Sequence, residues 1–186
     1  NKITTTSYDK KGRPVTIINP KLRVKTLTYD ALDRVVTIQY ADTTRVSYAY
    51  DVLSRRVTMQ DSGGNTTYAY SKRGELTDQT LPGSLRLQMA YDSVGNRTTL
   101  TDPDSGVTTT TFDALDRVSV VKSPAGRTIT NTYDAASRLV SLQTDQGWKR
   151  EWAYDANSRI TTLTEKNALG AIVFTMVDTW DAAGNK

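Results

Sequence analysis

The sequence predicts an all-β protein: tandem β-hairpins of about 21 residues each, forming one curved, spiralling antiparallel sheet. The first observation is an aromatic residue that returns at intervals of 21, 21, 20, 21, 21, 21, 21 and 26 residues. The second is the alternation of large and small side chains on both sides of it, which is typical of strands. The nine aromatic positions are Tyr8, Tyr29, Tyr50, Tyr70, Tyr91, Phe112, Tyr133, Tyr154 and Trp180.

Each repeat contains a strand that ends at this aromatic residue. The residue just before the aromatic is Ser, Thr or Ala in all nine repeats. Because successive side chains of a strand point to opposite faces, the aromatic belongs to one face and the small residue to the other. The small residues lead us to expect a close neighbour on that second face.

A tight turn is expected directly after the aromatic. Asp follows the aromatic in eight repeats, and Ser71 is the exception. The fourth residue after the aromatic is Gly, Asp or Ser, residue types that accept a positive φ with decreasing ease. This pattern predicts a type I turn with a bulge that closes a hairpin. The turn aspartates are Asp9, Asp30, Asp51, Asp92, Asp113, Asp134, Asp155 and Asp181.

The returning strand begins at the fifth residue after the aromatic. Arg stands there six times, and the ninth residue is apolar in most repeats, as in the stretches "RVVTI" and "RLVSL". One face of the sheet is therefore expected to be aromatic and aliphatic, and the other small or rich in Thr. The six arginines are Arg13, Arg34, Arg55, Arg117, Arg138 and Arg159.

A second turn closes most repeats, marked by Pro, Gly, Asn and Asp in stretches such as "DSGGN", "LPGS" and "SPAG". No segment has a sustained helical period. We therefore predict that residues 1–186 form a single array with nine registers, cut from a longer one. A propeller, a sandwich or a barrel are the alternatives; alternate repeats show no second period of the length that a propeller blade needs.

Composition excludes several kinds of chemistry. The chain has no Cys and no His, so it lacks disulfides, thiolate and imidazole metal ligands, and every triad with an imidazole base. No Gly loop that cradles phosphate and no nucleophile elbow is found. We expect no enzyme activity, no cofactor and no metal. Apolar runs stay far below the roughly 18 to 20 residues of a membrane span, and a signal peptide is absent from the first residues.

The repeated "YDxxGR", followed by an alternating strand, "TDPDSG" and another "YD", resembles the RHS or YD-repeat family. This family includes the shells of bacterial RHS polymorphic toxins, the B and C subunits of insecticidal toxin complexes and the teneurin YD shell. The resemblance covers essentially the whole chain. The departures are Ser71 with Glu75, Asn96 and Asn185 at the Arg position, and the long final interval.

The resemblance implies a function. It implies a spiral of hairpins that forms the wall of a hollow shell around a separate toxin or cargo domain. The partners would be the remaining repeats of the shell and its cargo, and the protein would be secreted or delivered extracellularly by bacteria. The identity of the cargo lies outside this chain.

Two binding hypotheses stand beside the structural one. The six arginines could form a basic ladder for phosphate or acidic glycans, but pairing with the turn aspartates is favoured, so nucleic acid is not expected as a partner. The alternative function is a carbohydrate-binding or adhesion module with exposed aromatic residues. Trp148, which lies outside the repeat register, is its candidate sugar contact.

Two expectations concern the last repeat and the ends. The interval from Tyr154 to Trp180 is five residues too long, an odd number that would invert every side chain inside a strand. We expect the extra residues in an enlarged second turn or a bulge within "TEKNALGAI", giving a longer hairpin. Both ends of the array are expected to expose unpaired strand edges, so that the isolated chain associates edge to edge or belongs to a larger shell.

Overall fold

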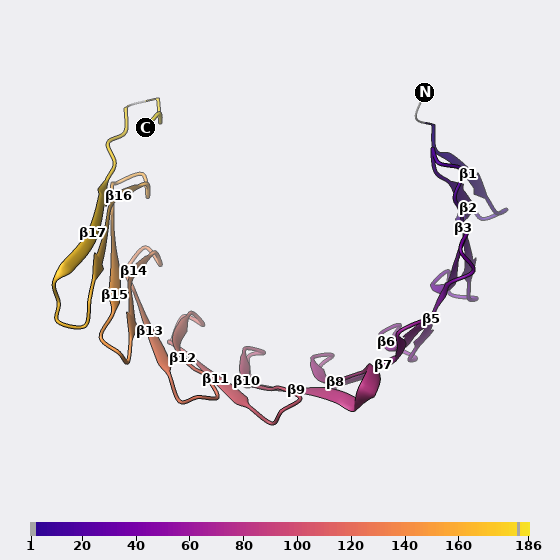
Figure 1. Cartoon of the computed structure of the whole chain (residues 1–186), viewed down its shortest axis with the longest axis horizontal. Helices are drawn as coiled ribbons and strands as arrows, with labels where there is room; N and C mark the ends of the chain where they lie inside the picture. Colours follow the sequence, from indigo (N-terminus) through magenta and orange to yellow (C-terminus); the bar gives the residue numbers. More distant parts are fainter. Residues whose placement is uncertain (1–2, 182) are drawn as a thin grey trace. The chain divides into compact units, whose positions relative to one another are not determined.

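The computed structural model describes residues 3–181 and 183–186, and this part of the chain consists of antiparallel strands, turns and one short 3-10 helix (Figure 1). The helix η1, Pro82–Ser84, lies in a second turn. None of the described residues belongs to a helix with the length and apolarity that a membrane crossing requires. The strands are β1 Thr5–Tyr8, β2 Pro14–Ile18, β3 Val24–Tyr29, β4 Val35–Tyr40, β5 Arg45–Tyr50, β6 Arg56–Asp61, β7 Gly64–Tyr70, β8 Leu76–Leu81, β9 Leu85–Tyr91, β10 Arg97–Thr101, β11 Val107–Phe112, β12 Val118–Lys122, β13 Thr128–Tyr133, β14 Leu139–Thr144, β15 Lys149–Tyr154, β16 Ile160–Lys166 and β17 Ile172–Val177.

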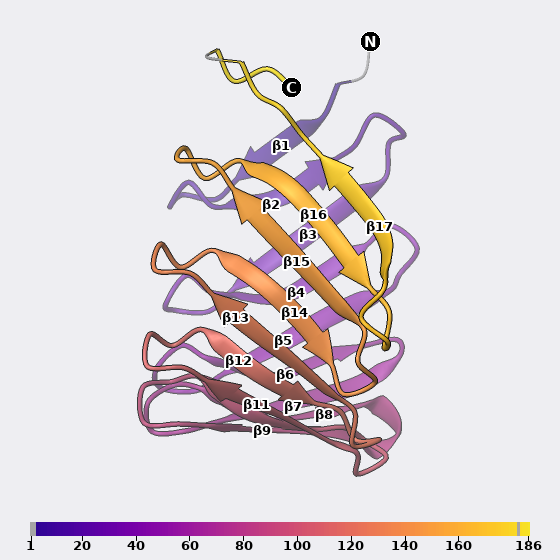
Figure 2. The ribbon, with the colours of Figure 1, turned by 90° about the vertical axis from the view of Figure 1, so that its left-hand side faces the viewer.

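Each strand pairs with the next along the chain, so the topology is an uninterrupted meander. The chain forms two units, Asn1–Gln88 and Met89–Lys186, and the boundary falls inside β9. Within each unit the hairpins follow one another side by side and the sheet is curved (Figure 1). In the second unit the turns after the aromatic residues line one margin and the second turns line the other (Figure 2). The predicted fold class is confirmed; the single array stays a prediction.

The first turn of each repeat, between the aromatic and the Arg position, has the predicted conformation. Its fourth residue has a positive φ in all nine repeats, from 58° at Asp116 to 98° at Gly95. The register between the two strands shifts by one residue at the aromatic, as between Thr28 and Tyr29. These are the two marks of a type I turn with a bulge.

A second turn that the sequence analysis missed joins β4 to β5 at Tyr40–Thr44. Thr43 has a φ of 68°, and the Thr44 N–H donates to Asp42 Oδ1 at 3.0 Å. The segment lacks Gly and Pro, so the Asp that caps the turn was the signal available.

The last hairpin is longer than the others, as predicted, but its turn is not enlarged. The turn Asn167–Ala171 has the same two backbone hydrogen bonds as the ordinary second turns. The ladder of paired residues is longer instead, with five pairs between β16 and β17 against three between β2 and β3, and a register shift between Glu165 and Lys166 marks a bulge. The bulge absorbs the odd residue and keeps Leu163 opposite Met176.

The sheet has two chemically different faces. One, the aromatic face, carries cross-strand pairs such as Leu27 with Ile38 and Tyr48 with Met59. The other, the threonine face, carries pairs such as Thr28 with Thr37, and the small residue before the aromatic is exposed in all nine repeats. No neighbour covers these small residues in the part of the chain that the structure describes.

A hydrophobic core is absent from the described residues. No apolar side chain is buried, and the one buried residue is Thr66, with 3% of its surface exposed. A single-layer sheet buries little apolar surface, so the hydrophobic effect contributes less here than in a two-layer domain. Contacts between consecutive strands must therefore hold the repeats together.

One aromatic-face position predicts a stabilising substitution. Asn131 lies opposite Leu142, and its Oδ1 is buried without a hydrogen-bond partner. Its Nδ2 donates to the Val118 carbonyl, which also accepts the Tyr133 hydroxyl. Asn131→Leu removes the unsatisfied acceptor at similar volume and should raise the free energy of unfolding by about 1 kcal/mol in urea titrations.

Asn131→Asp is the control for this prediction. It places a negative charge at the same half-buried position and should lower stability. A lower stability of Asn131→Leu than of the unaltered chain would contradict the assignment of Oδ1 as an unsatisfied group.

Candidate functional site

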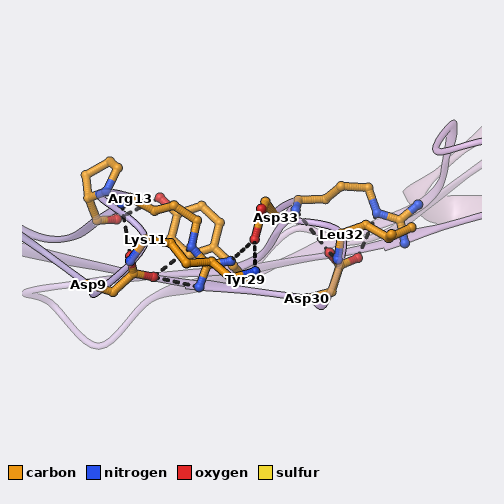
Figure 3. A network of polar contacts seen from close by, with 9 residues as sticks. Asp9, Lys11, Arg13, Tyr29, Asp30, Leu32 and Asp33 are labelled. Atoms are coloured by element: carbon orange, nitrogen blue, oxygen red, sulfur yellow. Dashed lines mark hydrogen bonds and ion pairs between the residues drawn. The ribbon is translucent and has the colours of Figure 1, made fainter.

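The recurring geometry of this chain is a contact between consecutive repeats that we call the arginine–aromatic clamp. It consists of the turn Asp and the Arg of one repeat and the aromatic residue of the next. Arg13 with Asp9 and Tyr29 shows it at close range (Figure 3). The sequence identified these residues individually, and the structure brings them together.

The turn Asp first organises its own turn. Asp9 Oδ1 accepts hydrogen bonds from the backbone N–H groups of Lys11 and Arg13, at 2.9 and 3.0 Å. Its Oδ2 accepts the Arg13 Nε–H at 2.7 Å, so the same carboxylate fixes both the turn and the guanidinium (Figure 3). The same Asp–Arg pairing recurs at every repeat that has both residues: Asp30–Arg34, Asp51–Arg55, Asp113–Arg117, Asp134–Arg138 and Asp155–Arg159.

The guanidinium then lies over the aromatic ring of the next repeat. The planar cation is attracted to the face of the ring, and the N–H groups at the edge of the guanidinium can still donate hydrogen bonds. The pairs are Arg13–Tyr29, Arg34–Tyr50, Arg55–Tyr70, Arg117–Tyr133, Arg138–Tyr154 and Arg159–Trp180, with Cζ 4.5 to 5.4 Å from the ring centroid.

The ring in turn donates a hydrogen bond back to the preceding repeat. The Tyr29 hydroxyl donates to the Pro14 carbonyl at 2.7 Å, and Trp180 Nε1–H donates to the Ile160 carbonyl at 2.8 Å. The ring can take this role because the backbone hydrogen-bond ladder between consecutive repeats is short. Strands β2 and β3 pair only from Thr16 with Thr26 to Ile18 with Val24, near the second turn. Toward the first turn the aromatic side chain takes over the role of the missing backbone partner.

The arginine also reaches the next turn. Arg117 Nη1 donates to the Asp134 carbonyl at 3.4 Å and to Ser137 Oγ at 3.1 Å. The second acceptor is the left-handed residue of that turn. Among the nine described first turns, the left-handed residues that are not Gly all accept such a bond from the preceding repeat: Asp33, Ser54, Asp116, Ser137 and Ser158.

These acceptors were not predicted as site residues. The available signal was the residue type: a Ser or Asp at a position that favours Gly needs a compensating contact. Gly stands there in the other turns, after Arg55 at Gly74 as well as after Glu75 at Gly95, and Gly needs no such contact. An inter-repeat hydrogen bond therefore offsets the backbone strain at the Ser and Asp positions.

Two junctions depart from the pattern in different ways. Ser71 Oγ donates to Glu75 Oε2 at 2.6 Å and accepts the Arg73 N–H, so the turn keeps its hydrogen bonds after losing both charges of the motif. At the other junction, Asn96 and Phe112 replace Arg and Tyr together. Asn96 Nδ2 reaches Asp92 Oδ2 and Asp116 Oδ1, at 3.1 and 2.9 Å.

A hollow of about 480 Å³ remains at this second junction. It lies over β10 and β11 and is lined by threonines, Phe112 and the acids Asp92, Asp113 and Asp116. Asn is too short to lie over the ring, and Phe has no hydroxyl to donate. The junction therefore lacks both the cation–π contact and the returning hydrogen bond.

The clamps hold the turn carboxylates in their charged form. The pKa of Asp113 lies below its ordinary value, chiefly because its carboxylate accepts a hydrogen bond from the Arg117 side chain. The pKa of Asp134 is lowered chiefly by the backbone N–H of Arg138, and the Arg138 side chain adds to the effect. Partial burial acts in the opposite direction at both residues. The arginines are thus committed to their own carboxylates, as the pairing hypothesis predicted.

Trp148 lies half-buried and is flanked by Arg150, whose Cζ is 5.3 Å from the Trp148 ring centroid and 6.0 Å from that of Trp152. Arg150 is also paired with Glu165. The guanidinium therefore covers part of the ring surface that a sugar would need. The carbohydrate contact stays a prediction, and a glycan array with Trp148→Ala as the control tests it.

Comparison with known proteins identifies the repeat. The family model described as the teneurin YD-shell matches residues 1–114, more than half of the chain. The chain belongs to the teneurin YD-shell family. A model of the RHS repeat matches residues 133–169 as well, so both the shell and the repeat of the predicted family are shown. No curated protein matches the chain.

Solved toxin-complex structures share the fold of this YD-shell chain. A crystal structure of TcdB2-TccC3-TEV superposes with a TM-score of 0.79 at 16% identity, covering 98% of this chain and 11% of that one. The Photorhabdus luminescens Tc holotoxin pore, carrying a TccC3 mutation, gives 0.66 at 13% identity, with 96% and 13% covered. The chain thus spans about a tenth of the length of these relatives.

The first prediction from the clamp is energetic coupling within it. A double-mutant cycle with Asp113→Ala and Arg117→Ala should give a coupling energy above zero, measured by urea unfolding, because the two side chains share hydrogen bonds. A second cycle with Arg117→Ala and Asp134→Ala should give much weaker coupling, since Arg117 contacts only the Asp134 backbone. Zero coupling in both cycles would contradict the clamp.

The second prediction repairs the incomplete junction. Asn96→Arg combined with Phe112→Tyr should restore both missing contacts, and the two contacts together should add about 1 kcal/mol to the free energy of unfolding. In calorimetry this corresponds to a rise in Tm of about 2 to 4 °C. Each single substitution should give less than half of the gain. A double variant no more stable than the better single variant would show that the two positions do not act together.

Proposed function

We propose that this chain is a non-catalytic segment of wall in an RHS/YD-type toxin shell, and that the shell encloses a separate cargo or toxin domain. The observation that carries the proposal is the clamp, which links hairpins at six junctions in a sheet whose described residues form no buried apolar core. Such an arrangement extends a surface in one direction and suits a wall. The family and the fold of the toxin-complex chains support it.

The polar side chains also support a structural role. The repeated Asp, Arg and Tyr residues are occupied by contacts within and between turns. From the family we further infer secretion or extracellular delivery by bacteria, with the remaining repeats of the shell and its cargo as partners.

Limited proteolysis of the full-length protein that contains this chain tests enclosure. Sites in the enclosed domain should be cut much more slowly in the native protein than after its separation from the shell. The double variant Arg117→Gln and Arg138→Gln removes two clamps and should speed that cleavage. Arg45→Gln with Arg127→Gln removes two exposed arginines that make no clamp, and it should leave the rate unchanged. Equal cleavage of native and separated cargo would refute enclosure.

The outer edge of β17 predicts association of the isolated chain. The strand pairs with β16 and has no other partner among the described residues, and its side chains are apolar and exposed, with Ile172 at 63% and Val177 at 68%. Long apolar edges recruit further strands. Sedimentation at about 100 μM should therefore show dimers or larger species. Val173→Lys should reduce them, whereas Thr43→Lys, in an ordinary second turn, should not.

A monodisperse monomer at that concentration, with slow hydrogen exchange throughout β17, would contradict this prediction. It would mean that the strand is stable without a partner at its outer edge.

A further inference from the structure

Arg56 differs from the six arginines of the clamps. It lies on the aromatic face, six residues after Tyr50, in a position that is apolar in most repeats. Its Cζ is 5.6 Å from the ring centroid of Tyr48 and 4.8 Å from that of Tyr68. The guanidinium is thus flanked by rings from the two neighbouring strands, β5 and β7.

No carboxylate neutralises this guanidinium. Each clamp arginine has a turn Asp, whereas Arg56 makes no ion pair and no side-chain hydrogen bond within the described residues, and it is exposed. The hydroxyls of Tyr48 and Tyr68 also make no hydrogen bond in that part of the chain. In contrast, the neighbouring Tyr70 hydroxyl is used, donating to the Arg56 carbonyl at 2.9 Å.

We propose that Tyr48, Arg56 and Tyr68 form a binding site for a carboxylate side chain of an acidic peptide segment. A guanidinium presents paired N–H donors that match the two oxygens of a carboxylate, and the rings restrict its motion without using those donors. The two free hydroxyls add further donors. The rings and the nearby Met59 offer apolar contact to the rest of the peptide.

The charge balance favours a carboxylate over a phosphate. Arg56 supplies one uncompensated positive charge, and the nearest clamp arginines, Arg34 and Arg55, are already paired with Asp30 and Asp51. A single carboxylate matches one charge, whereas a phosphate carries up to two and a nucleic acid needs several cations along its backbone. The site does not depend on the chain's enclosing a cargo, so it stands apart from the proposed wall function.

The chain contains a matched control for this site. Arg97 occupies the same register, six residues after Tyr91, but Met89 and Thr110 stand where Tyr48 and Tyr68 stand around Arg56. It is exposed like Arg56 and forms no ion pair in the described part of the chain. The two arginines therefore differ in their aromatic neighbours.

The experiment is an NMR titration with a blocked Gly-Glu-Gly peptide, observing the arginine Nε–Hε signals of the 186-residue chain with Val173→Lys, the substitution that reduces its association. The Arg56 signal should shift saturably and the Arg97 signal should not. Arg56→Gln should weaken binding at least about tenfold, as expected when a charged hydrogen-bonding partner is lost. Arg97→Gln should leave the affinity within about twofold of the unaltered chain. Arg56→Lys keeps the charge but not the paired N–H donors of the guanidinium, so its affinity should lie between these limits.

Four results would overturn the proposal. The first is that a blocked Gly-Gln-Gly peptide binds as well as the Glu peptide, and the second is that inorganic phosphate binds the site more strongly than the Glu peptide does. The third is that the Arg56 and Arg97 signals shift equally. The fourth is that Arg56→Gln binds the Glu peptide as well as the unaltered chain. The thermal unfolding of each variant shows whether its sheet is intact. If Arg56→Gln unfolds, Tyr48→Phe with Tyr68→Phe replaces it and should weaken binding by removing the two hydroxyl donors.

Discussion

The structure depends on one constraint: consecutive hairpins share a backbone ladder only near their second turns. Strands β2 and β3 are hydrogen-bonded over three residue pairs, and the same holds for β12 and β13. Beyond those pairs a backbone carbonyl of the preceding repeat would lack a partner on the next strand. The aromatic residue supplies a donor at this place, and the arginine above it holds the ring. A side-chain contact thus completes what the backbone leaves open, and it recurs at six junctions along the chain.

This constraint explains why the motif joins residues of such different kinds. Asp sets the turn conformation, Arg needs Asp to be fixed, and the ring needs Arg above it and a carbonyl beside it. The left-handed turn residue belongs to the same network. Ser or Asp is tolerated at this position because its side chain accepts a hydrogen bond from the preceding repeat, as at Ser137, whereas Gly needs no such contact. A Ser or Asp at one turn therefore relies on a donor from the repeat before it.

Much of the fold was predictable from the sequence because its period is short and regular. The spacing of the aromatic residues located the strands, and Gly, Asp and Ser located the first turns. The turn at Tyr40–Thr44 was missed because its cap is an Asp rather than a Gly or Pro. The last hairpin was predicted to be long, but sequence spacing could not say that the paired ladder lengthens while the turn keeps its size. A bulge and a larger turn can each take up an odd number of extra residues without inverting the faces of the strand.

The candidate site was predictable only in part, because sequence distance hides which repeat a side chain contacts. The pairing of Asp113 with Arg117 follows from their spacing. That Arg117 lies over Tyr133, and that the ring donates back to Val118, requires the register between strands. Arg56 gave no signal in the sequence, because an arginine at an apolar position becomes informative only when its neighbours on β5 and β7 are known.

The incomplete junction at Asn96 and Phe112 has a mechanical consequence. A sheet pulled perpendicular to its strands opens one ladder at a time, and the resistance of each step is set by the weakest connection between neighbours. Most junctions oppose opening with backbone pairs and a clamp, whereas β10 and β11 rely on three backbone pairs and the short reach of Asn96. If such a chain must be threaded or unwound under force, this junction is where tearing begins, and the hairpins on either side would part as intact groups.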